Sequence, residues 1–331
     1  MCKRRAPNAG LGAFAVCALG TCFSRMCRAL IAFVKLGRPK FLVGGFLLYA
    51  LGAALAGLAG VPISWHRYVW GQAIVSTTQL MTHYANDYFD LEADRANATP
   101  TQWSGGSRIL PSGQLAPRVA LIAALVLGGV ALSIAVLAST RVHGAPLLLP
   151  IALLMLGLSW AYSAPPLRLL SRGLGELTTA LVVTLLTPLL GFYVQTGALQ
   201  LLPVLACLPL CGLQFAMLLT IELPDAASDA ALGKRTLVVR RGAEWAARAG
   251  AGIVAVSFAA LPLLVWFGLP WPIAALSALP ALLGLWHALR LLRGAFRDPK
   301  HFAGLAFCSV LLVAGTTLTE LIGALLSAHG F

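Results

Sequence analysis

Two clusters of acidic residues carry the most distinctive chemistry in this chain of 331 residues. They lie within residues 86–94 and 222–229 and together hold seven of the eleven acidic residues. One spacing recurs in both: Asp87, Asp90 and Asp94 in the first cluster, and Glu222, Asp225 and Asp229 in the second. Carboxylates packed this closely repel one another unless a cation neutralises them, and Mg²⁺ takes oxygen ligands of this kind. The spacing therefore indicates a divalent-cation site.

Helical geometry suggests how the two clusters could be positioned. Residues three and four apart share one face of a helix. This predicts one polar stripe made of Gln79, His83, Asp87, Asp90 and Asp94. A second stripe at matching offsets consists of Gln214, Glu222, Asp225 and Asp229. Polar groups left in lipid cost several kcal/mol each, so we expect the stripes to face a shared cavity.

The composition of the chain is that of an integral membrane protein. Hydrophobic residues make up 59% and charged residues only 11%, against about 25% charged residues in soluble domains. The net charge of +13 does not indicate nucleic-acid binding, because the basic residues are spread between apolar runs. Seven cysteines without paired spacing favour neither disulfides nor zinc.

Apolar runs predict an all-α, polytopic membrane bundle with nine transmembrane helices. Each run is close to the 20 or so residues that cross a bilayer. The expected spans are 41–60, 65–87, 117–139, 145–162, 174–196, 199–223, 245–268, 271–290 and 302–327.

The distribution of Lys and Arg predicts that the N-terminus is cytoplasmic. On this topology 22 of the 24 basic residues lie on the cytoplasmic side, and only Arg67 and Arg141 lie outside. Both acidic clusters then fall at cytoplasmic helix ends, in what we expect to be a bacterial inner membrane. Residues 1–34 are expected to form a basic, poorly ordered tail, with a cleaved signal or lipoprotein segment as the alternative, and 35–331 to form one domain.

A diphosphate suits two facing carboxylate clusters that hold Mg²⁺, because the metal bridges it and neutralises its charge. Basic side chains should then act as electrostatic clamps. Arg108 follows Gly105-Gly106-Ser107, and Lys234 and Arg235 lie in Gly233-Lys234-Arg235-Thr236. The alternative is that these residues are ordinary topology charges.

The two motifs resemble those of the UbiA superfamily of intramembrane prenyltransferases. The family's first signature, N-D-x-x-D-x-x-x-D, is matched by Asn86, Asp87, Asp90 and Asp94. Its second, D-x-x-x-D, is matched by Asp225 and Asp229. The stretches 108–113, 162–168 and 233–237 are also similar, and the resemblance covers about 35–327.

The resemblance implies a Mg²⁺-dependent enzyme that ionises an allylic polyprenyl diphosphate and transfers the prenyl group to an aromatic acceptor. It implies metal binding by Asp87, Asp90, Asp94, Asp225 and Asp229, of which the last four would act in catalysis. Tyr162 would lie near the reacting carbon or the leaving oxygen. The substrate would be bound by Asn86, Arg108, Arg168, Lys234, Arg235 and Glu222.

The second motif departs from the family pattern. Ile221 stands where the family often has Asn, and Glu222 is expected to compensate. Pro224 removes a backbone donor just before Asp225 and should bend or break the helix there.

The acceptor is suggested by stretches 171–176 and 193–197, which resemble the branch that prenylates 1,4-dihydroxy-2-naphthoate for menaquinone. Other acceptors stay open: 4-hydroxybenzoate, homogentisate, haem or a glycerol phosphate. A cation-coupled transporter is a further alternative, although transporters usually place such acids near the membrane midplane. Glu176 either stabilises a helix N-terminus or supports the site, and His83 is expected to be a packed, hydrogen-bonded histidine.

Overall fold

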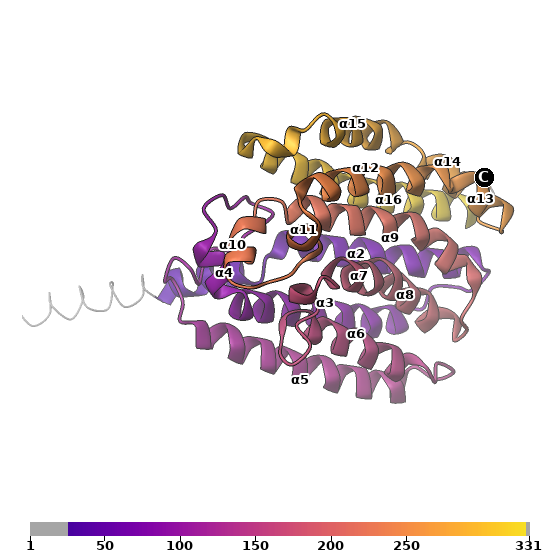
Figure 1. Ribbon diagram of the computed structural model, residues 1–331. Helices are drawn as coiled ribbons and strands as arrows, with labels where there is room; N and C mark the ends of the chain where they lie inside the picture. The colour runs from indigo at the N-terminus through magenta and orange to yellow at the C-terminus, as the bar shows by residue number, and fades with distance from the viewer. Residues whose placement is uncertain (1–25, 329–331) are drawn as a thin grey trace, which may run out of the picture.

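The computed structural model describes residues 26–328, and the regular secondary structure of this part of the chain is all helical (Figure 1). The long helices of the first half are α2 (Pro39–Leu58), α3 (Trp65–Phe89), α5 (Pro117–Arg141) and α6 (Leu148–Ser163). A composite helix follows, made of α7 (Gly175–Thr179), η2 (Ala180–Leu186) and α8 (Thr187–Thr196). The second half holds α9 (Leu201–Ile221), α12 (Ala243–Ala259), α13 (Leu261–Trp266), α14 (Trp271–Ser277), α15 (Ala281–Leu292) and α16 (Phe302–Ala328).

Short helices occupy the connections at one end of the bundle. They are α4 (Leu91–Ala96), η1 (Leu170–Arg172), α10 (Ala226–Ala231), α11 (Leu237–Arg241), η3 (Ala295–Arg297) and η4 (Pro299–His301). Residues 26–36 also form a helix, whose Ala32 and Leu36 are buried against Met81 and Tyr84 of α3. Residues 1–25 of the expected basic tail lie outside the described part of the chain.

Each of the nine expected spans coincides with one helix or with consecutive helices. By length and composition alone, six helical segments of residues 26–328 could cross a membrane, or seven if the bent pair α14 and α15 is one span. Helix α6 is shorter, and α3 carries the polar residues of the first motif. The chain is thus an integral membrane protein with an all-helical fold, while the count of nine and the cytoplasmic N-terminus stay predictions.

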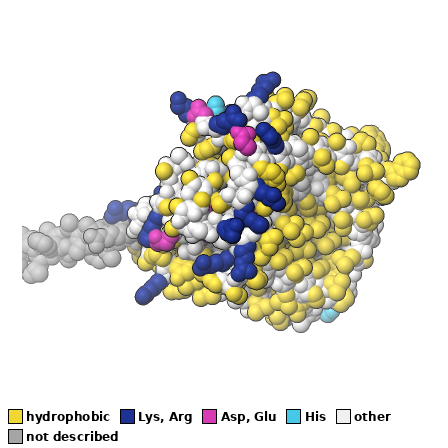
Figure 2. Space-filling view, viewed as in Figure 1, with side chains coloured by type: hydrophobic (Ala, Val, Ile, Leu, Met, Phe, Trp, Pro, Cys, Tyr) yellow, Lys and Arg dark blue, Asp and Glu magenta, His cyan; other side chains and the backbone are white. Residues whose placement is uncertain are grey.

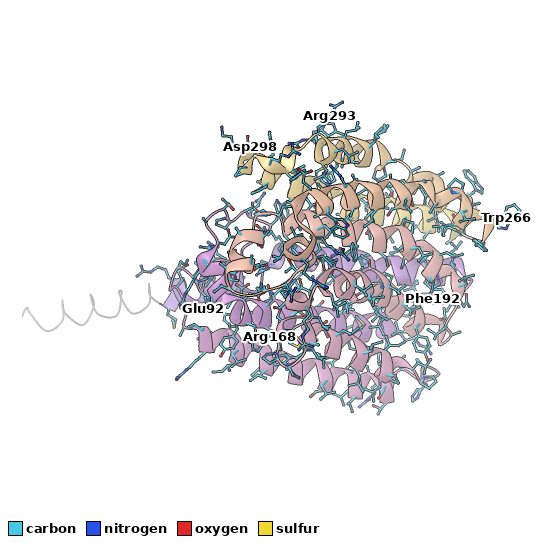
Figure 3. The ribbon with its side chains drawn as sticks, viewed as in Figure 1. Glu92, Arg168, Phe192, Trp266, Arg293 and Asp298 are labelled. Atoms are coloured by element: carbon cyan, nitrogen blue, oxygen red, sulfur yellow. The ribbon has the colours of Figure 1, made fainter. Side chains whose placement is uncertain are left out.

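The surface supports insertion in a bilayer. Large apolar side chains such as Ile122, Val256 and Leu282 are 60%, 67% and 79% exposed, and yellow hydrophobic atoms cover most of the face in Figure 2. Lys and Arg gather toward the end that carries α4 and α10 (Figure 2). Glu92 and Arg168 lie toward this end, whereas Trp266 lies at the opposite one (Figure 3). We refer to the first as the charged end.

Glycines let α2 and α8 pack with their backbones in close contact. A Cβ atom on Gly52 would lie 1.9 Å from the carbonyl oxygen of Pro188, and one on Gly191 would lie 2.4 Å from that of Tyr49. Small residues permit this approach between membrane helices, where packing rather than the hydrophobic effect drives association. The contact fixes α2 against the composite helix, and both elements form walls of the cavity described below.

Both acidic motifs interrupt their helices. Helix α3 ends at Phe89 and Asp90 links it to α4, so the first stripe does not follow one continuous helix, although Gln79, His83, Asp90 and Asp94 all line the cavity described below. Helix α9 ends at Ile221, before Pro224, and α10 begins at Ala226, which confirms the predicted break. The missing backbone donor of proline explains the second interruption.

Candidate active site

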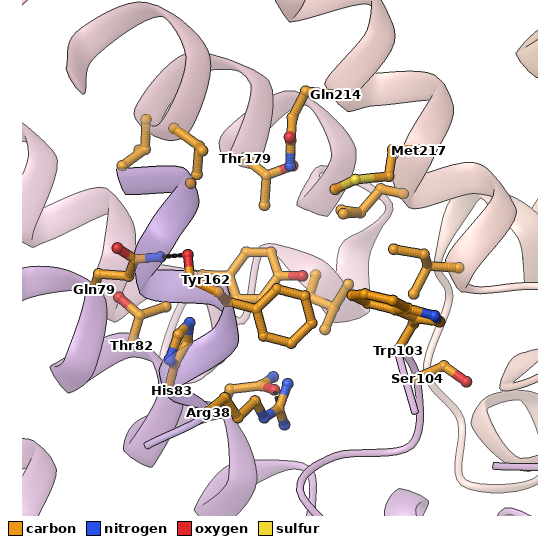
Figure 4. Close-up of a pocket in the computed structure, with 18 of the residues that line it drawn as sticks. Arg38, Gln79, Thr82, His83, Trp103, Ser104, Tyr162, Thr179, Gln214 and Met217 are labelled. Carbon is orange, nitrogen blue, oxygen red and sulfur yellow. Dashed lines mark hydrogen bonds between the residues drawn. The ribbon is translucent and has the colours of Figure 1, made fainter. Parts of the chain in front are cut away.

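A cavity of about 440 Å³ opens between the helices and receives both acidic motifs. Its charged end is lined by Asn86, Asp90, Asp94, Glu222, Asp225, Asp229 and Lys234. Its deeper wall is mostly apolar and includes Leu47, Leu48, Val75, Met155, Val182 and Val310. Figure 4 shows Arg38, Trp103 and Gln214 approaching the cavity from separate segments of the chain. One space therefore combines charged groups with a largely apolar wall.

Lys234 joins the two motifs directly. Its Nζ lies 3.0 Å from Oδ1 of Asp90 in the first motif and 3.1 Å from Oδ1 of Asp229 in the second. Burial would lower the pKa of Lys234, but the two carboxylates raise it above its usual value. The ammonium group is therefore held in its charged form between the motifs, as the expected clamp requires.

The loop after α4 ties the motifs together a second time. Asn97 Nδ2 donates to Asp225 Oδ1 at 2.6 Å, and the backbone N–H of Gly105 donates to Asp225 Oδ2 at 3.2 Å. Gly106 packs directly on the first motif, because a Cβ atom there would lie 2.0 Å from Asp94 Oδ2. The carboxylates are thus positioned by backbone groups of a glycine-containing loop.

Asp87 was expected to be a metal ligand, but the structure buries it behind the cavity wall. It is 1% exposed, forms an ion pair with Arg38, and accepts hydrogen bonds from the backbone N–H, at 3.1 Å, and the hydroxyl of Ser107. It is not among the residues that line the cavity, unlike Asp90 and Asp94. Asp87 therefore anchors Arg38 and the loop behind the cavity wall.

Asn86 and Tyr162 lie where the motif comparison expected them, on the cavity wall. Asn86 Nδ2 donates to Asp90 Oδ2 at 2.6 Å and to Ser163 Oγ at 3.0 Å, which links the first motif to the end of α6. Tyr162 is within electrostatic range of the carboxylates of Asp90 and Glu222. His83 is hydrogen-bonded, as expected, with Nδ1 2.7 Å from the carbonyl oxygen of Gly37.

Of the four basic residues expected to hold a diphosphate, only Lys234 lines the main cavity. Arg108 donates instead to the backbone carbonyl of Asp94. Arg168 is exposed and lines a smaller adjoining pocket that also reaches Asp90 and Lys234. Arg235 is exposed, and its backbone N–H donates to the carbonyl of Ser171 at 2.9 Å.

Crowding of the carboxylates changes their acidity. Burial, followed by the charges of Asp90 and Asp87, raises the pKa of Asp94 to about 8. Burial and the neighbouring Asp229 raise the pKa of Asp225 to about 6, against the lowering effect of Gly105 and Lys234. The pKa of Asp229 is also raised by burial. Burial and mutual repulsion therefore favour the protonated form of these carboxyl groups unless a further cation is bound.

The family model for UbiA prenyltransferases matches residues 46–311, which span both motifs and the cavity. The chain belongs to the UbiA prenyltransferase family. It is therefore an enzyme of the prenyltransferase class. A comparison with curated proteins found no significant match.

Solved structures share the fold. A structure of digeranylgeranylglyceryl phosphate synthase is 17% identical with a TM-score of 0.62, and the match covers 90% of this chain and 99% of that one. A UbiA homologue from Archaeoglobus fulgidus, bound to GPP and Mg²⁺, is 16% identical with a TM-score of 0.58, covering 87% and 99%. An apo homologue from Aeropyrum pernix K1 is 19% identical with a TM-score of 0.60, covering 82% and 96%.

The carboxylates around the cavity are the candidate ligands for a divalent cation. Within residues 26–328, no three His, Cys, Asp or Glu side chains are grouped closely enough to hold a metal as they stand. The carboxylates are instead engaged by Lys234 and by loop donors. Their chemistry nevertheless fits a hard cation, because Asp90, Asp94 and Asp225 interact electrostatically around one cavity and repel one another.

The sequence comparison overlooked Arg38 and Asn97. Arg38 belongs to neither acidic motif, yet it lines the cavity, forms the ion pair with Asp87 and lies 3.3 Å from Asn86 Oδ1. Its position immediately before Pro39, where the first span begins, is the signal that could have found it. Asn97 had no such signal, because its link to Asp225 joins residues 128 positions apart.

Proposed function

We propose that this protein transfers a polyprenyl group from its diphosphate to an aromatic acceptor, with Mg²⁺ as cofactor, and that the acceptor is 1,4-dihydroxy-2-naphthoate in menaquinone biosynthesis. One observation carries the proposal: two acidic motifs meet at the charged end of a single cavity whose remaining walls are apolar. A diphosphate suits the first environment and a prenyl chain the second.

Mg²⁺ would be held by Asp90, Asp94, Asp225 and Asp229, with Asp87 supporting this set from behind through Arg38. Bound there, the metal would neutralise the charge of the leaving diphosphate. A homologue structure in complex with DMAPP and Mg²⁺ supports this pairing of ligand and ion. Lys234 supplies a fixed positive charge at the same place, and Arg38 a second.

The remaining walls would protect the carbocation that forms when the allylic diphosphate ionises. Side chains of α2, α6, η2 and α16 exclude water from the deeper compartment through residues such as Leu48, Met155, Val182 and Val313. A low-dielectric environment strengthens the electrostatic effect of the charged end and keeps water from capturing the cation. Tyr162 lies between the two regions, within range of Asp90.

We propose that the active site lies near the cytoplasmic face of the membrane. Lys and Arg are concentrated at the charged end (Figure 2), and such residues are usually on the cytoplasmic side. A cysteine introduced at exposed Glu92 should react with a membrane-impermeant thiol reagent only from the cytoplasmic side. Labelling of this cysteine from outside intact cells would show that the charged end faces away from the cytoplasm.

Isolated membranes given Mg²⁺, a labelled prenyl diphosphate and a panel of acceptors test the proposed reaction. We expect a prenylated product with 1,4-dihydroxy-2-naphthoate and not with 4-hydroxybenzoate, homogentisate, haem or glycerol phosphate. Product from another acceptor would replace the naphthoate assignment. Substrate uptake into proteoliposomes without diphosphate release would instead favour a transporter.

A further inference from the structure

Two buried glutamates lie next to each other beside the cavity. Glu176 in the first turn of α7 is 0% exposed, and Glu222 after α9 is 7% exposed. Their carboxyl groups lie within interaction range of one another. We call them the glutamate pair.

The glutamate pair has unused hydrogen-bonding capacity. The two carboxyl groups interact with each other, and Glu176 also with its own backbone N–H and that of Leu237, but no other group in the described part of the chain donates to Glu222. Buried polar atoms are rarely left in this state, because each costs about 1–3 kcal/mol. Glu176 lies in the first turn of α7, where a negative charge is favourable, so its own position is accounted for by the helix. A donor group on a ligand in the cavity would satisfy Glu222, which lines the cavity.

The position of Glu222 says where that ligand would be. Glu222 lines the main cavity together with Tyr162, Thr178 and Gln214, whereas Glu176 lies behind this wall. Tyr162 is within electrostatic range of both glutamates, and Lys234 is within range of Glu222. The pair is thus beside the charged end but offers hydrogen-bond acceptors rather than cations.

We propose that Glu222, positioned by Glu176, is the subsite that recognises a hydroxyl group on the acceptor ring. The carboxyl group of Glu222, 7% exposed, lines the cavity and offers it an acceptor oxygen to which no group outside the pair donates within the described residues. A hydroxyl group on the acceptor would donate to that oxygen. An ether at the same point has no hydrogen to donate and would leave the oxygen unpaired, and a carboxylate would be repelled by it. This inference rests on the proposed prenyl transfer and adds the chemical group by which the acceptor is chosen.

Binding of matched probes tests the pair without requiring turnover. Purified protein would be titrated with 1,4-dihydroxy-2-naphthoate and with its 1,4-dimethoxy analogue, using quenching of tryptophan fluorescence, because Trp103 lines the cavity. We expect a preference for the hydroxyl probe of at least about tenfold, typical of a hydrogen bond to a charged group. Glu222→Gln and Glu176→Gln should each reduce this preference to about threefold or less, because a neutral acceptor bonds more weakly.

Two controls separate recognition from structure and from metal binding. Glu320→Gln changes another buried glutamate, 1% exposed, which does not line the cavity, and it should keep the wild-type preference. Binding of geranyl diphosphate with Mg²⁺ should stay within about twofold of wild type in Glu176→Gln, because Glu176 does not line the cavity. A general packing defect would weaken both naphthoate probes equally and leave their ratio unchanged.

The inference would be overturned if both variants kept the wild-type preference for the dihydroxy over the dimethoxy naphthoate. Loss of geranyl diphosphate binding in Glu222→Gln would also overturn it, because Glu222 would then be a metal ligand. Failure of the proposed acceptor looks different. If neither naphthoate binds but 4-hydroxybenzoate is preferred over 4-methoxybenzoate in a Glu222-dependent way, the naphthoate assignment falls and the hydroxyl subsite stands.

Discussion

Asn97 Nδ2 donates a hydrogen bond of 2.6 Å to Oδ1 of Asp225, and so connects the segment after the first acidic motif to the second motif. The same carboxylate accepts from the N–H of Gly105. Two parts of the chain that are 128 residues apart thereby share one carboxyl group. The site is therefore assembled by the loop between α4 and α5 as much as by the helices that carry the motifs.

Neutralising one carboxylate in either motif should abolish prenyl transfer. We expect Asp90→Asn and Asp225→Asn each to lower kcat/KM by at least about 100-fold, because each removes charge from the diphosphate-binding end. Turnover of labelled prenyl diphosphate in isolated membranes measures the effect. The matched control is Glu92→Gln in the same motif. The Glu92 side chain is 71% exposed, so this variant should keep kcat/KM within about twofold of wild type. Full activity in both Asp variants would remove the metal-site assignment.

Replacing Lys234 should change the affinities for cation and anion in opposite directions. Lys234→Met removes the positive charge between Asp90 and Asp229, so Mn²⁺ alone should bind several-fold more tightly. Geranyl diphosphate should bind about tenfold or more weakly, because a charge-assisted contact is lost. Paramagnetic resonance of Mn²⁺ and ligand titration give the two numbers. If both affinities fall together, Lys234 holds the structure of the site rather than its charge balance.

Gly106 and Gly113 allow a matched test of the loop that packs on Asp94. Both have φ of +72°, so alanine costs about 1 kcal/mol of backbone energy at either position. Only at Gly106 would the new Cβ meet Asp94 Oδ2, at 2.0 Å, whereas no described atom lies within 4 Å of a Cβ at Gly113. We expect Gly106→Ala to lose at least about tenfold in kcat/KM and Gly113→Ala to stay near wild type. Equal losses would show that backbone conformation alone matters.

Arg38 and Asp87 should behave as a coupled pair. Arg38→Met leaves the carboxylate of Asp87, 1% exposed, without its ion-pair partner and should lower the free energy of unfolding by about 3 kcal/mol. The double variant Arg38→Met/Asp87→Asn should recover part of that stability, since the uncompensated buried charge is gone. Thermal unfolding in detergent measures both. Lys35→Met, at an exposed position nearby, is the control, and additive losses in the double variant would refute the coupling.

Metal binding should release protons and strengthen with rising pH. Asp94 has its pKa raised to about 8 and Asp225 to about 6, chiefly by burial. Between pH 6 and 8 these carboxyl groups are partly protonated without metal, and a cation must displace those protons. The apparent affinity for Mg²⁺ should therefore increase from pH 6 to pH 8, and calorimetry in buffers of different ionisation enthalpy should detect proton release. Asp94→Asn should flatten this dependence, and a flat wild-type curve would contradict the raised pKa values.

The helical class and the partnership of the two motifs could be predicted from the sequence because hydropathy and spacing are local properties. Lys234 could be chosen because it follows the second motif within a few residues. The break before Asp225 was predictable for the same reason, since Pro224 cannot donate a helical hydrogen bond.

Only the tertiary structure decided which groups face the cavity. Helix α3 ends at Phe89, and this places Asp87 behind the wall while Asp90 and Asp94 line it. Arg108 bonds a backbone carbonyl, and Arg38 from the start of α2 takes a place on the wall. Glu176 and Glu222 become neighbours because α7 packs on α9. These outcomes depend on where helices end and loops cross, which contacts between distant residues determine, so no local pattern of residues could specify them.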